Sequence, residues 1–444
     1  MFVAEAPKVE DLERKLGRDK TLAALRAPVD PRCRRRYLHW EKLKRLQSPP
    51  GLSSEQWWLK IRSARSDGWR DLPLTDSEGR PFGYTLPDAV LRSLHQVDQL
   101  PVEAIDAGTL SEREGRRRFL VNSLMEEAIR SSQLEGATTS RVEAKELLLS
   151  GRRPRDRSEQ MIANNYRAIQ FMREEMGTTL TPDAVCELQR VLTEGTLDDP
   201  SAAGRLQLPG ERRVVVLDRD GGRAVHRPPP AEQLPQRMRL LCEFANGAGD
   251  DDAFVHPVVR AILLHFWLAY DHPFLDGNGR TARILFFWSM RASRYRLAEY
   301  LPISRLIRDA PGKYGRAFLE TETDGGDTTY FLLHQLDVIE QAGRDMNRYL
   351  ARKRAERAQV KELLQGVEEL NGRQLVLLTH AIKHPDHTYT FGGHARSNRV
   401  THETARADLG ALAERGLLVR KRAGRTYKFE PPVDLPRRLK ESDA

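Results

Sequence analysis

The sequence predicts a mainly α-helical protein with one β-hairpin among its helices and a winged helix-turn-helix at its C-terminal end. Three observations predict this fold class. Apolar residues recur at spacings of three to five in the segment 111–149, which is the pattern of an amphipathic helix. The β-branched run Val214–Val216 is followed by a turn with two glycines and a second strand pattern. After residue 370, three helix patterns precede two short basic strand patterns.

The length of 444 residues suggests about three domains, at roughly 150 residues each. We expect a helical region over 1–105, a helical core over 106–350 and the winged helix over 351–444. Four of the six tryptophans lie in the first region, where we expect a small local core: Trp40, Trp57, Trp58 and Trp69. Apolar residues at 39% and charged residues at 30% suit a folded chain and exclude a disordered one.

Membrane and disulfide-rich classes are not favoured. The longest apolar stretch, Ile262–Tyr270, is too short to span a bilayer and is interrupted by a histidine. The first residues lack the basic segment and apolar core of a secretory signal. Cys33, Cys186 and Cys242 are widely spaced, which argues against a disulfide framework or a zinc ribbon. We therefore expect a cytoplasmic protein with no membrane partner.

The central helices have recognisable ends. Ser140 and Glu143 form the expected capping box of a helix from Arg141 to Leu149, and Gly136 interrupts the helix before it. Beyond further helices over 158–177 and 181–194, the strands Val214–Leu217 and Arg223–His226 predict the hairpin. A lone hairpin is marginal unless it packs on something, so we expect an adaptable flap.

Two apolar helices follow, from Pro257 to about Asp271 and from Thr281 to Met290, and the loop between them is rich in polar groups. Gly277 and Gly279 let the backbone turn tightly and approach a ligand closely. Asn278 and Gly279 place free N–H groups at the start of the next helix, where an anion is favoured. Arg280 and Arg283 share the first turn of that helix, so the sequence predicts a polyphosphate cradle.

The same loop holds one acid and one histidine. A single carboxylate with substrate phosphates is how Mg²⁺ is usually held, and Asp276 is the acid of the loop. His272 can accept a proton near neutral pH. We expect Phe274 to be a buried anchor that points the loop.

The segment His272–Arg283 resembles the signature of the Fic family, HxFx(D/E)GNGRxxR, at every defined position. The resemblance covers about residues 110–345. It implies a helical core, a flap over the active site, and transfer of AMP from ATP to a Ser, Thr or Tyr hydroxyl of a protein. The related Doc kinases carry Lys at the position of Gly279, so phosphoryl transfer is not favoured here.

The resemblance also implies residue roles. His272 would deprotonate the attacking hydroxyl, and Asp276 would hold Mg²⁺. The phosphates of ATP would be bound by Asn278 with the backbone of Gly277 to Gly279, by Arg280 at the β-phosphate and by Arg283 at the γ-phosphate. Val214, Val215 and Val216 of the flap would pair with the backbone of the target.

A second segment, Ser131 to Gly136, is similar to the inhibitory motif of the family, (S/T)xxxE(G/N). The implied role is an ion pair from Glu135 to Arg283, with Ser131 on the same helix face. The carboxylate would compete for the guanidinium that the γ-phosphate needs. In some members the same glutamate supports removal of AMP, and this de-AMPylating activity stays an alternative.

The C-terminal part has 19 Lys and Arg against 12 Asp and Glu from residue 351, so most of the net charge of +9 lies in the last fifth of the chain. The segment Thr401–Arg415 is expected to be the recognition helix of the winged helix, and the basic hairpin from Leu417 to Phe429 its wing. Binding to DNA and docking of a protein remain alternative roles for this part.

The leading hypothesis is an autoinhibited protein adenylyltransferase that uses ATP and Mg²⁺ and modifies a protein, with self-modification as one case. One rival is a DNA-binding regulator whose core senses nucleotide without turnover. Intact His272 favours the enzyme, because a sensor needs no base. A second rival transfers another phosphate-containing group, such as UMP or phosphocholine. A homodimer is an alternative for the assembly.

Overall fold

The computed structural model describes residues 3–28, 36–100, 113–217, 224–249, 253–365, 370–423 and 426–441. The protein is mainly helical, as predicted, and divides into two compact units, Met1–Met346 and Asn347–Ala444. Strands within the described ranges form three separate antiparallel pairs. None of the described helices is long and apolar enough to cross a membrane.

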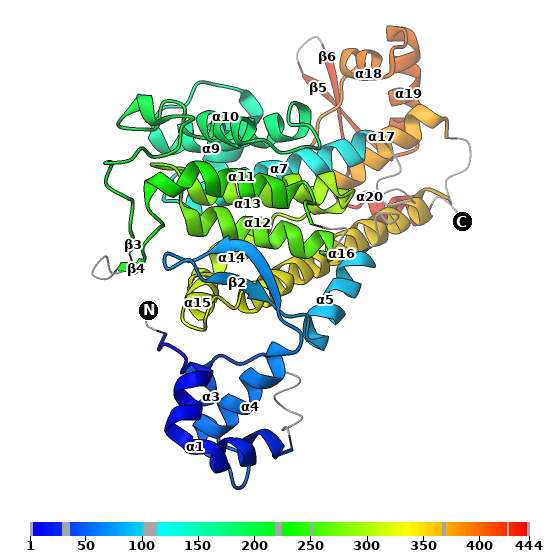
Figure 1. Ribbon diagram of the computed structural model, residues 1–444. Coiled ribbons are helices and arrows are strands. Elements are labelled where there is room, and N and C mark those ends of the chain that lie inside the picture. Colours follow the sequence, from blue (N-terminus) through cyan, green and yellow to red (C-terminus); the bar gives the residue numbers. More distant parts are fainter. Residues whose placement is uncertain are drawn as a thin grey trace. The chain divides into compact units, whose positions relative to one another are not determined.

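The first unit begins with a small cluster of helices, which is blue in Figure 1. Trp57 and Trp58 are buried in this cluster. A capping box between Ser53 and Gln56 starts one of its helices. Trp40 packs against the cluster, whereas Trp69 lies outside it and packs on Gly83. The helices of this region are α1 (Val9–Arg26), α3 (Trp40–Leu43), α4 (Ser54–Ser66) and α5 (Asp88–Asp98).

The region 1–105 also contains a hairpin that the sequence analysis did not anticipate. Strand β1 (Arg70–Thr75) pairs with β2 (Pro81–Tyr84). Leu72 and Leu74 are buried at alternate positions of β1, which is the period of a half-buried strand. This region is therefore helical only in part.

The core of the first unit is built on α12 (Pro257–Asp271) and α13 (Asn278–Ala292), which lie side by side in Figure 1. Every residue from Val258 to Leu268 is buried, because α12 is apolar almost all round. Helices α7, α9 and α10 pack against α13, and α11 packs against α12. The remaining core helices are α7 (Arg113–Leu134), α8 (Arg141–Ser150), α9 (Arg157–Glu174), α10 (Pro182–Thr193), α11 (Leu234–Ala245), α14 (Ile303–Asp309), α15 (Pro311–Glu322) and α16 (Thr329–Gln365).

The corner between α7 and α8 forms as the capping pattern predicts. The Ser140 hydroxyl accepts from the Glu143 N–H at 3.3 Å, and the Glu143 carboxylate accepts from the Ser140 N–H at 3.3 Å. Gly136 adopts φ 100° directly after α7, which a residue with a Cβ rarely does. This corner brings the end of α7 next to α13.

The first flap strand is shorter than predicted. Strand β3 (Val216–Leu217) pairs with β4 (Ala224–His226), and the turn between them lies outside the described residues. Val214 and Val215 precede the paired part. Short 3₁₀ helices complete the connections of this unit: η1 (Pro200–Ala202), η2 (Ala231–Gln233) and η3 (Arg296–Tyr300).

In the second unit, three helices precede a pair of strands, which is the order predicted for residues after 370. Its helices and strands are α17 (Gly372–Lys383), α18 (Phe391–Asn398), α19 (His402–Glu414), β5 (Val419–Ala423), β6 (Thr426–Glu430) and α20 (Leu435–Glu441). Strands β5 and β6 form the predicted hairpin, and Tyr389 adds a bridge to Phe429. The core contains Leu378, Leu409 and Phe429. The residues 424–425 of the predicted turn lie outside the described part of the chain.

Candidate active site

The loop between α12 and α13 carries the residues predicted to do chemistry. His272 ends α12 in the left-handed backbone region with φ 46°, and Gly277 precedes α13 with φ 85°. For a residue with a Cβ this conformation costs roughly 1–2 kcal/mol, so the surrounding structure must hold His272 in it.

The side-chain amide of Asn278 closes this loop. Its Oδ1 accepts from the Phe274 N–H at 2.9 Å, and its Nδ2 donates to the Phe274 carbonyl at 2.8 Å. Phe274 is fully buried, as expected of an anchor. The amide of Asn278 therefore supports the loop, and its backbone N–H and remaining Nδ2 hydrogen are what it has left for a phosphate.

The imidazole of His272 is arranged to accept a proton. Its Nδ1 lies 3.4 Å from the carbonyl oxygen of Ala269. Since a carbonyl only accepts, Nδ1 carries the hydrogen and the lone pair is on Nε2. Burial lowers the pKa of His272 to about 4, so the ring is neutral at physiological pH.

This environment predicts a pH titration. In the nucleotide-free protein, the ring signals of His272 in an NMR pH series are expected to shift with a midpoint near pH 4, because burial disfavours the charged ring. A midpoint near 6.5 for His272 would contradict the buried setting.

The start of α13 presents cationic groups inside the protein. Arg280 is fully buried; its Nη1 donates to the Leu192 carbonyl at 3.1 Å and its Nη2 lies 3.3 Å from the Asp276 carboxylate. Its Nε is buried and has no partner within the described residues. A buried guanidinium N–H without a partner is costly, and an anion bound at the helix N-terminus would satisfy it.

Arg283 is held by the end of α7. Its Nε donates to the Ser131 hydroxyl at 2.8 Å, and its Nη2 donates to the Glu135 carboxylate at 2.8 Å and the Ser131 carbonyl at 3.2 Å. The Arg283 side chain is 1% exposed and that of Glu135 is 29% exposed. The three predicted partners thus meet, although 148 residues separate Glu135 from Arg283.

The absence of a side chain at Gly279 makes room for this pair. A Cβ at position 279 would lie 2.2 Å from Oε1 of Glu135 and 3.1 Å from Nη1 of Arg283. Any larger residue at this position would force the Glu135 carboxylate to move. The glycine therefore serves close approach, and the approaching group in this structure is Glu135.

Asp276 is the acid of the site. Its Oδ1 accepts from the Gly277 N–H at 2.5 Å, and its side chain is 36% exposed. One accessible carboxylate beside a phosphate cradle fits Mg²⁺, which is bound by one or two carboxylates together with phosphates and water. Within the described ranges no group of three His, Cys, Asp or Glu side chains is arranged to hold a metal ion.

One residue that supports the loop was not among the predicted site residues. Gln189 of α10 donates from Nε2 to the Asp276 carbonyl at 3.0 Å and accepts from the Gly204 N–H at 2.6 Å. The sequence holds one clue to this role: Gln189 is a polar residue on the apolar face of α10, four positions after Val185 and three before Leu192. Near the site, the hydroxyl of Tyr314 lies 2.8 Å from Nε2 of the buried His265.

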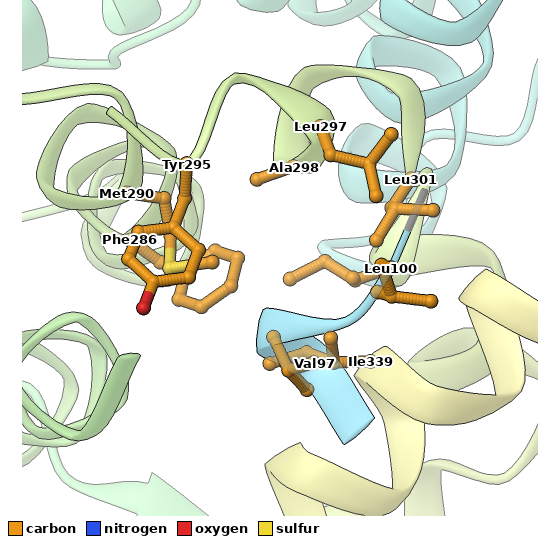
Figure 2. Close-up of a pocket in the computed structure, with 10 residues that line it drawn as sticks. Val97, Leu100, Phe286, Met290, Tyr295, Leu297, Ala298, Leu301 and Ile339 are labelled. Atoms are coloured by element: carbon orange, nitrogen blue, oxygen red, sulfur yellow. The ribbon is translucent and has the colours of Figure 1, made fainter. Parts of the chain in front are cut away.

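A separate apolar cavity lies between α5, α13, η3 and α16 (Figure 2). Val97, Phe286, Met290 and Leu301 are among its lining residues, and no predicted site residue is. Its internal volume of about 20 Å³ is on the scale of one water molecule. It is too small for a nucleotide.

The central part of the chain is similar to known proteins. Residues 179–290 match the model of the Fic/DOC family. A Nematostella vectensis protein named Protein adenylyltransferase Fic is 36% identical over 108 residues, which is 24% of this chain and 22% of that protein. The protein of the same name from Drosophila yakuba is 40% identical over 60 residues, 14% of this chain and 12% of that protein. The chain thus matches less than a quarter of the length of these relatives.

Among solved structures, a Fic family protein from Desulfovibrio desulfuricans G20 is similar, with a TM-score of 0.55 and 18% identity. The similarity covers 79% of this chain and 98% of that one. At this identity the likeness shows the fold.

Proposed function

We propose that this chain, in which residues 179–290 form a domain of the Fic/DOC family, transfers AMP from ATP to a Ser, Thr or Tyr hydroxyl of a protein. One observation carries the proposal. A neutral histidine with its lone pair on Nε2 lies on the same short loop as an accessible carboxylate, a helix N-terminus and two buried arginines. This set suits in-line attack on a polyphosphate.

In the proposed step, the target hydroxyl oxygen attacks the α-phosphorus while its proton passes to Nε2 of His272. The new O–P bond forms as the bond from the α-phosphorus to the bridging oxygen breaks, and pyrophosphate leaves. Bound Mg²⁺, held by Asp276, would neutralise charge on the phosphates. Arg280 and Arg283 would bind the β- and γ-phosphates. Nearby phosphates would also raise the pKa of His272 above its low value in the free protein.

We infer that Glu135 inhibits this reaction. The Arg283 guanidinium donates to Glu135 and to Ser131, so it is occupied before ATP binds. A γ-phosphate at Arg283 would have to displace the carboxylate, and while the pair persists ATP would bind without the γ-phosphate contact. Removal of AMP with help from Glu135 stays the alternative use of the same side chain.

The target would be held by the flap. Val214, Val215 and Val216 lead into β3, and an extended segment of a target can add to such an edge through backbone hydrogen bonds. Pairing of this kind positions the target hydroxyl through backbone hydrogen bonds and depends little on the side chains of the target. Self-modification is one case.

Intact-mass spectrometry tests the transferred group. The Glu135→Gly variant is incubated with Mg²⁺ and ATP, with Mg²⁺ and UTP, or with CDP-choline, in the presence of a cell lysate. An added mass equal to AMP, from ATP alone, is expected on the chain itself or on a lysate protein. Addition of UMP or phosphocholine in its place would favour the rival transfer reactions.

A second candidate function concerns the second unit. Exposed basic residues lie mainly on the wing, which carries Arg420, Lys421, Arg422 and Lys428, and Arg406 is the one on α19. Some are engaged locally, since Lys421 pairs with Glu430 and Arg420 lies over the Tyr427 ring at 4.6 Å. A helix followed by an exposed basic hairpin suits the groove and backbone of duplex DNA.

If the second unit binds duplex DNA, its affinity is expected to fall with salt at a slope near −0.9 per phosphate contacted. The double change Lys421→Ala, Arg422→Ala is expected to reduce the magnitude of the salt slope by the contribution of about two phosphate contacts. A gel-shift series from about 50 mM salt upward measures both. No shift at low salt would favour docking of a protein.

A further inference from the structure

Three consecutive backbone carbonyls at the end of α12 are satisfied by side chains from the two ends of the flap. His226 Nε2 donates to the Tyr270 carbonyl at 2.7 Å. Arg213 Nη2 donates to the carbonyls of Asp271 at 2.7 Å and His272 at 3.1 Å. The last carbonyls of a helix have no partner within it, and cationic groups there are favoured by the helix dipole.

Arg213 also joins the flap to itself and to the loop. Its Nε donates to the carbonyl of Pro229, which follows the second flap strand, at 2.8 Å. Its Nη1 donates to the side chain of Gln207, whose backbone N–H donates to the Pro273 carbonyl at 2.9 Å. One planar guanidinium therefore connects the start of the flap, its end and the residues on both sides of His272.

His226 is held between two acceptors. Its Nδ1 lies 2.9 Å from the Glu322 carboxylate while Nε2 meets the Tyr270 carbonyl, and its side chain is 9% exposed. Burial acts to lower the pKa of His226, but the hydrogen bond and charge of Glu322 outweigh it and raise the pKa. The Asp271 carboxylate acts in the same direction. Because the carboxylate and the carbonyl both accept, this setting favours the protonated ring, in which both nitrogens carry hydrogen.

The Asp271 side chain has its own anchor. Its carboxylate accepts from Arg237 at 2.8 Å and from the indole of Trp267 at 2.9 Å, and Arg237 also donates to the Thr75 carbonyl at 2.7 Å. Asp271, which precedes His272, is thus held through its side chain by Arg237 and through its carbonyl by Arg213. This explains how the left-handed backbone of His272 is maintained.

We propose that Arg213 and His226 are positioning residues that hold the flap and His272 in one fixed geometry, so that a target strand on the flap presents its hydroxyl to Nε2 of His272. The proposal rests on the function proposed above. Neither residue needs to touch ATP, because both act through backbone carbonyls and the flap. Loss of Arg213 would let the flap and the base shift relative to each other, and a misplacement of about 1 Å can cost about 10²-fold in rate.

The test uses the full chain in a Glu135→Gly background. Arg213→Gln removes the guanidinium that bonds to several carbonyls. Arg213→Lys keeps the positive charge but can donate to fewer of these carbonyls. Arg212→Gln, at an exposed neighbouring position, is the matched control. Transfer is measured at saturating ATP, nucleotide affinity by titration, and folding by thermal melting. We expect transfer by Arg213→Gln to fall about 10²-fold, with nucleotide affinity within about twofold of the background. Arg213→Lys is expected to be intermediate and Arg212→Gln unchanged.

The outcomes separate this inference from the proposed function. If Glu135→Gly itself transfers no AMP, the proposed function fails. If it transfers AMP and Arg213→Gln does so at the same rate, the positioning role is wrong. If Arg213→Gln melts at a lower temperature than the background variant, the result for Arg213→Lys is used in its place. A folded Arg213→Lys protein that transfers AMP at the background rate would also contradict the positioning role.

A pH profile provides the second readout. In the background variant, transfer is expected to decline as the pH rises and His226 loses its proton, because the bond to Glu322 or to Tyr270 is then lost. The raised pKa of His226 places this decline above the usual range of a histidine. His226→Gln keeps one donor and no titrating proton, so its rate is expected to be lower at neutral pH and flat across this range. The same alkaline decline in both variants would assign it to another group and contradict the role of His226.

Discussion

Replacing His272 with alanine is expected to slow AMP transfer by about 10²–10⁴-fold, which is the usual contribution of a positioned base. Nucleotide affinity is expected to change little, because the phosphates are assigned to α13 and its arginines. The measurement compares single-turnover transfer and ATP binding for Glu135→Gly with and without His272→Ala. His95→Ala, at an exposed site on α5, is the control. Full transfer by the His272→Ala protein would show that His272 is not the base.

Replacing Glu135 with glycine is expected to give the largest gain in activity. The change frees Arg283, whose Nη2 donates to Glu135 at 2.8 Å. A shift of roughly 1.4 kcal/mol toward the competent state already gives tenfold more transfer. Folding is expected to survive, since Glu135 follows the end of α7 and a glycine there costs about 1 kcal/mol or less.

Two further variants make this prediction specific. Glu135→Gln keeps the shape and removes the charge, so an intermediate gain is expected. Arg283→Ala also breaks the pair, but it removes the phosphate contact and is expected to lower transfer. The inhibitory interpretation of Ser131 to Gly136 is wrong if Glu135→Gly is folded and no more active than the parent.

Local sequence patterns predicted the parts of the fold that depend on neighbours in sequence. The capping box at Ser140 and Glu143 forms as expected, and the two apolar helices enclose the loop at His272. These features follow from short-range hydrogen bonds and from helix periodicity, which one stretch of sequence contains. The hairpin of β1 and β2 was missed although Leu72 and Leu74 alternate, because pairing depends on a partner strand that the pattern does not identify.

The contacts that position the site could not be predicted in this way. Arg213 meets the Asp271 carbonyl across 58 residues, and Gln189 meets the Asp276 carbonyl across 87 residues. Side chains that bond to backbone carbonyls leave no residue pattern at the accepting position. The pairing of Glu135 with Arg283 was expected only through resemblance to a family motif, since neither periodicity nor spacing connects two residues 148 apart.

The low pKa of His272 has the same origin. The isolated residue suggested a group that titrates near neutral pH. Burial at the end of α12 lowers the pKa to about 4, so the ring enters the reaction neutral. That value depends on how the whole core excludes water around the ring, which the loop sequence does not state.

The most direct test of the central claim follows the fate of the α-phosphate. Glu135→Gly protein is incubated with Mg²⁺ and ATP labelled either in the α- or in the γ-phosphate, alone and with a cell lysate, and the combined variant Glu135→Gly, His272→Ala is run beside it. AMP transfer predicts protein-bound label from α-labelled ATP only, dependent on His272, with the γ-label released in pyrophosphate. Protein-bound label from γ-labelled ATP would show phosphoryl transfer, and no bound label from either nucleotide would show a core without transferase activity; either result would contradict the account.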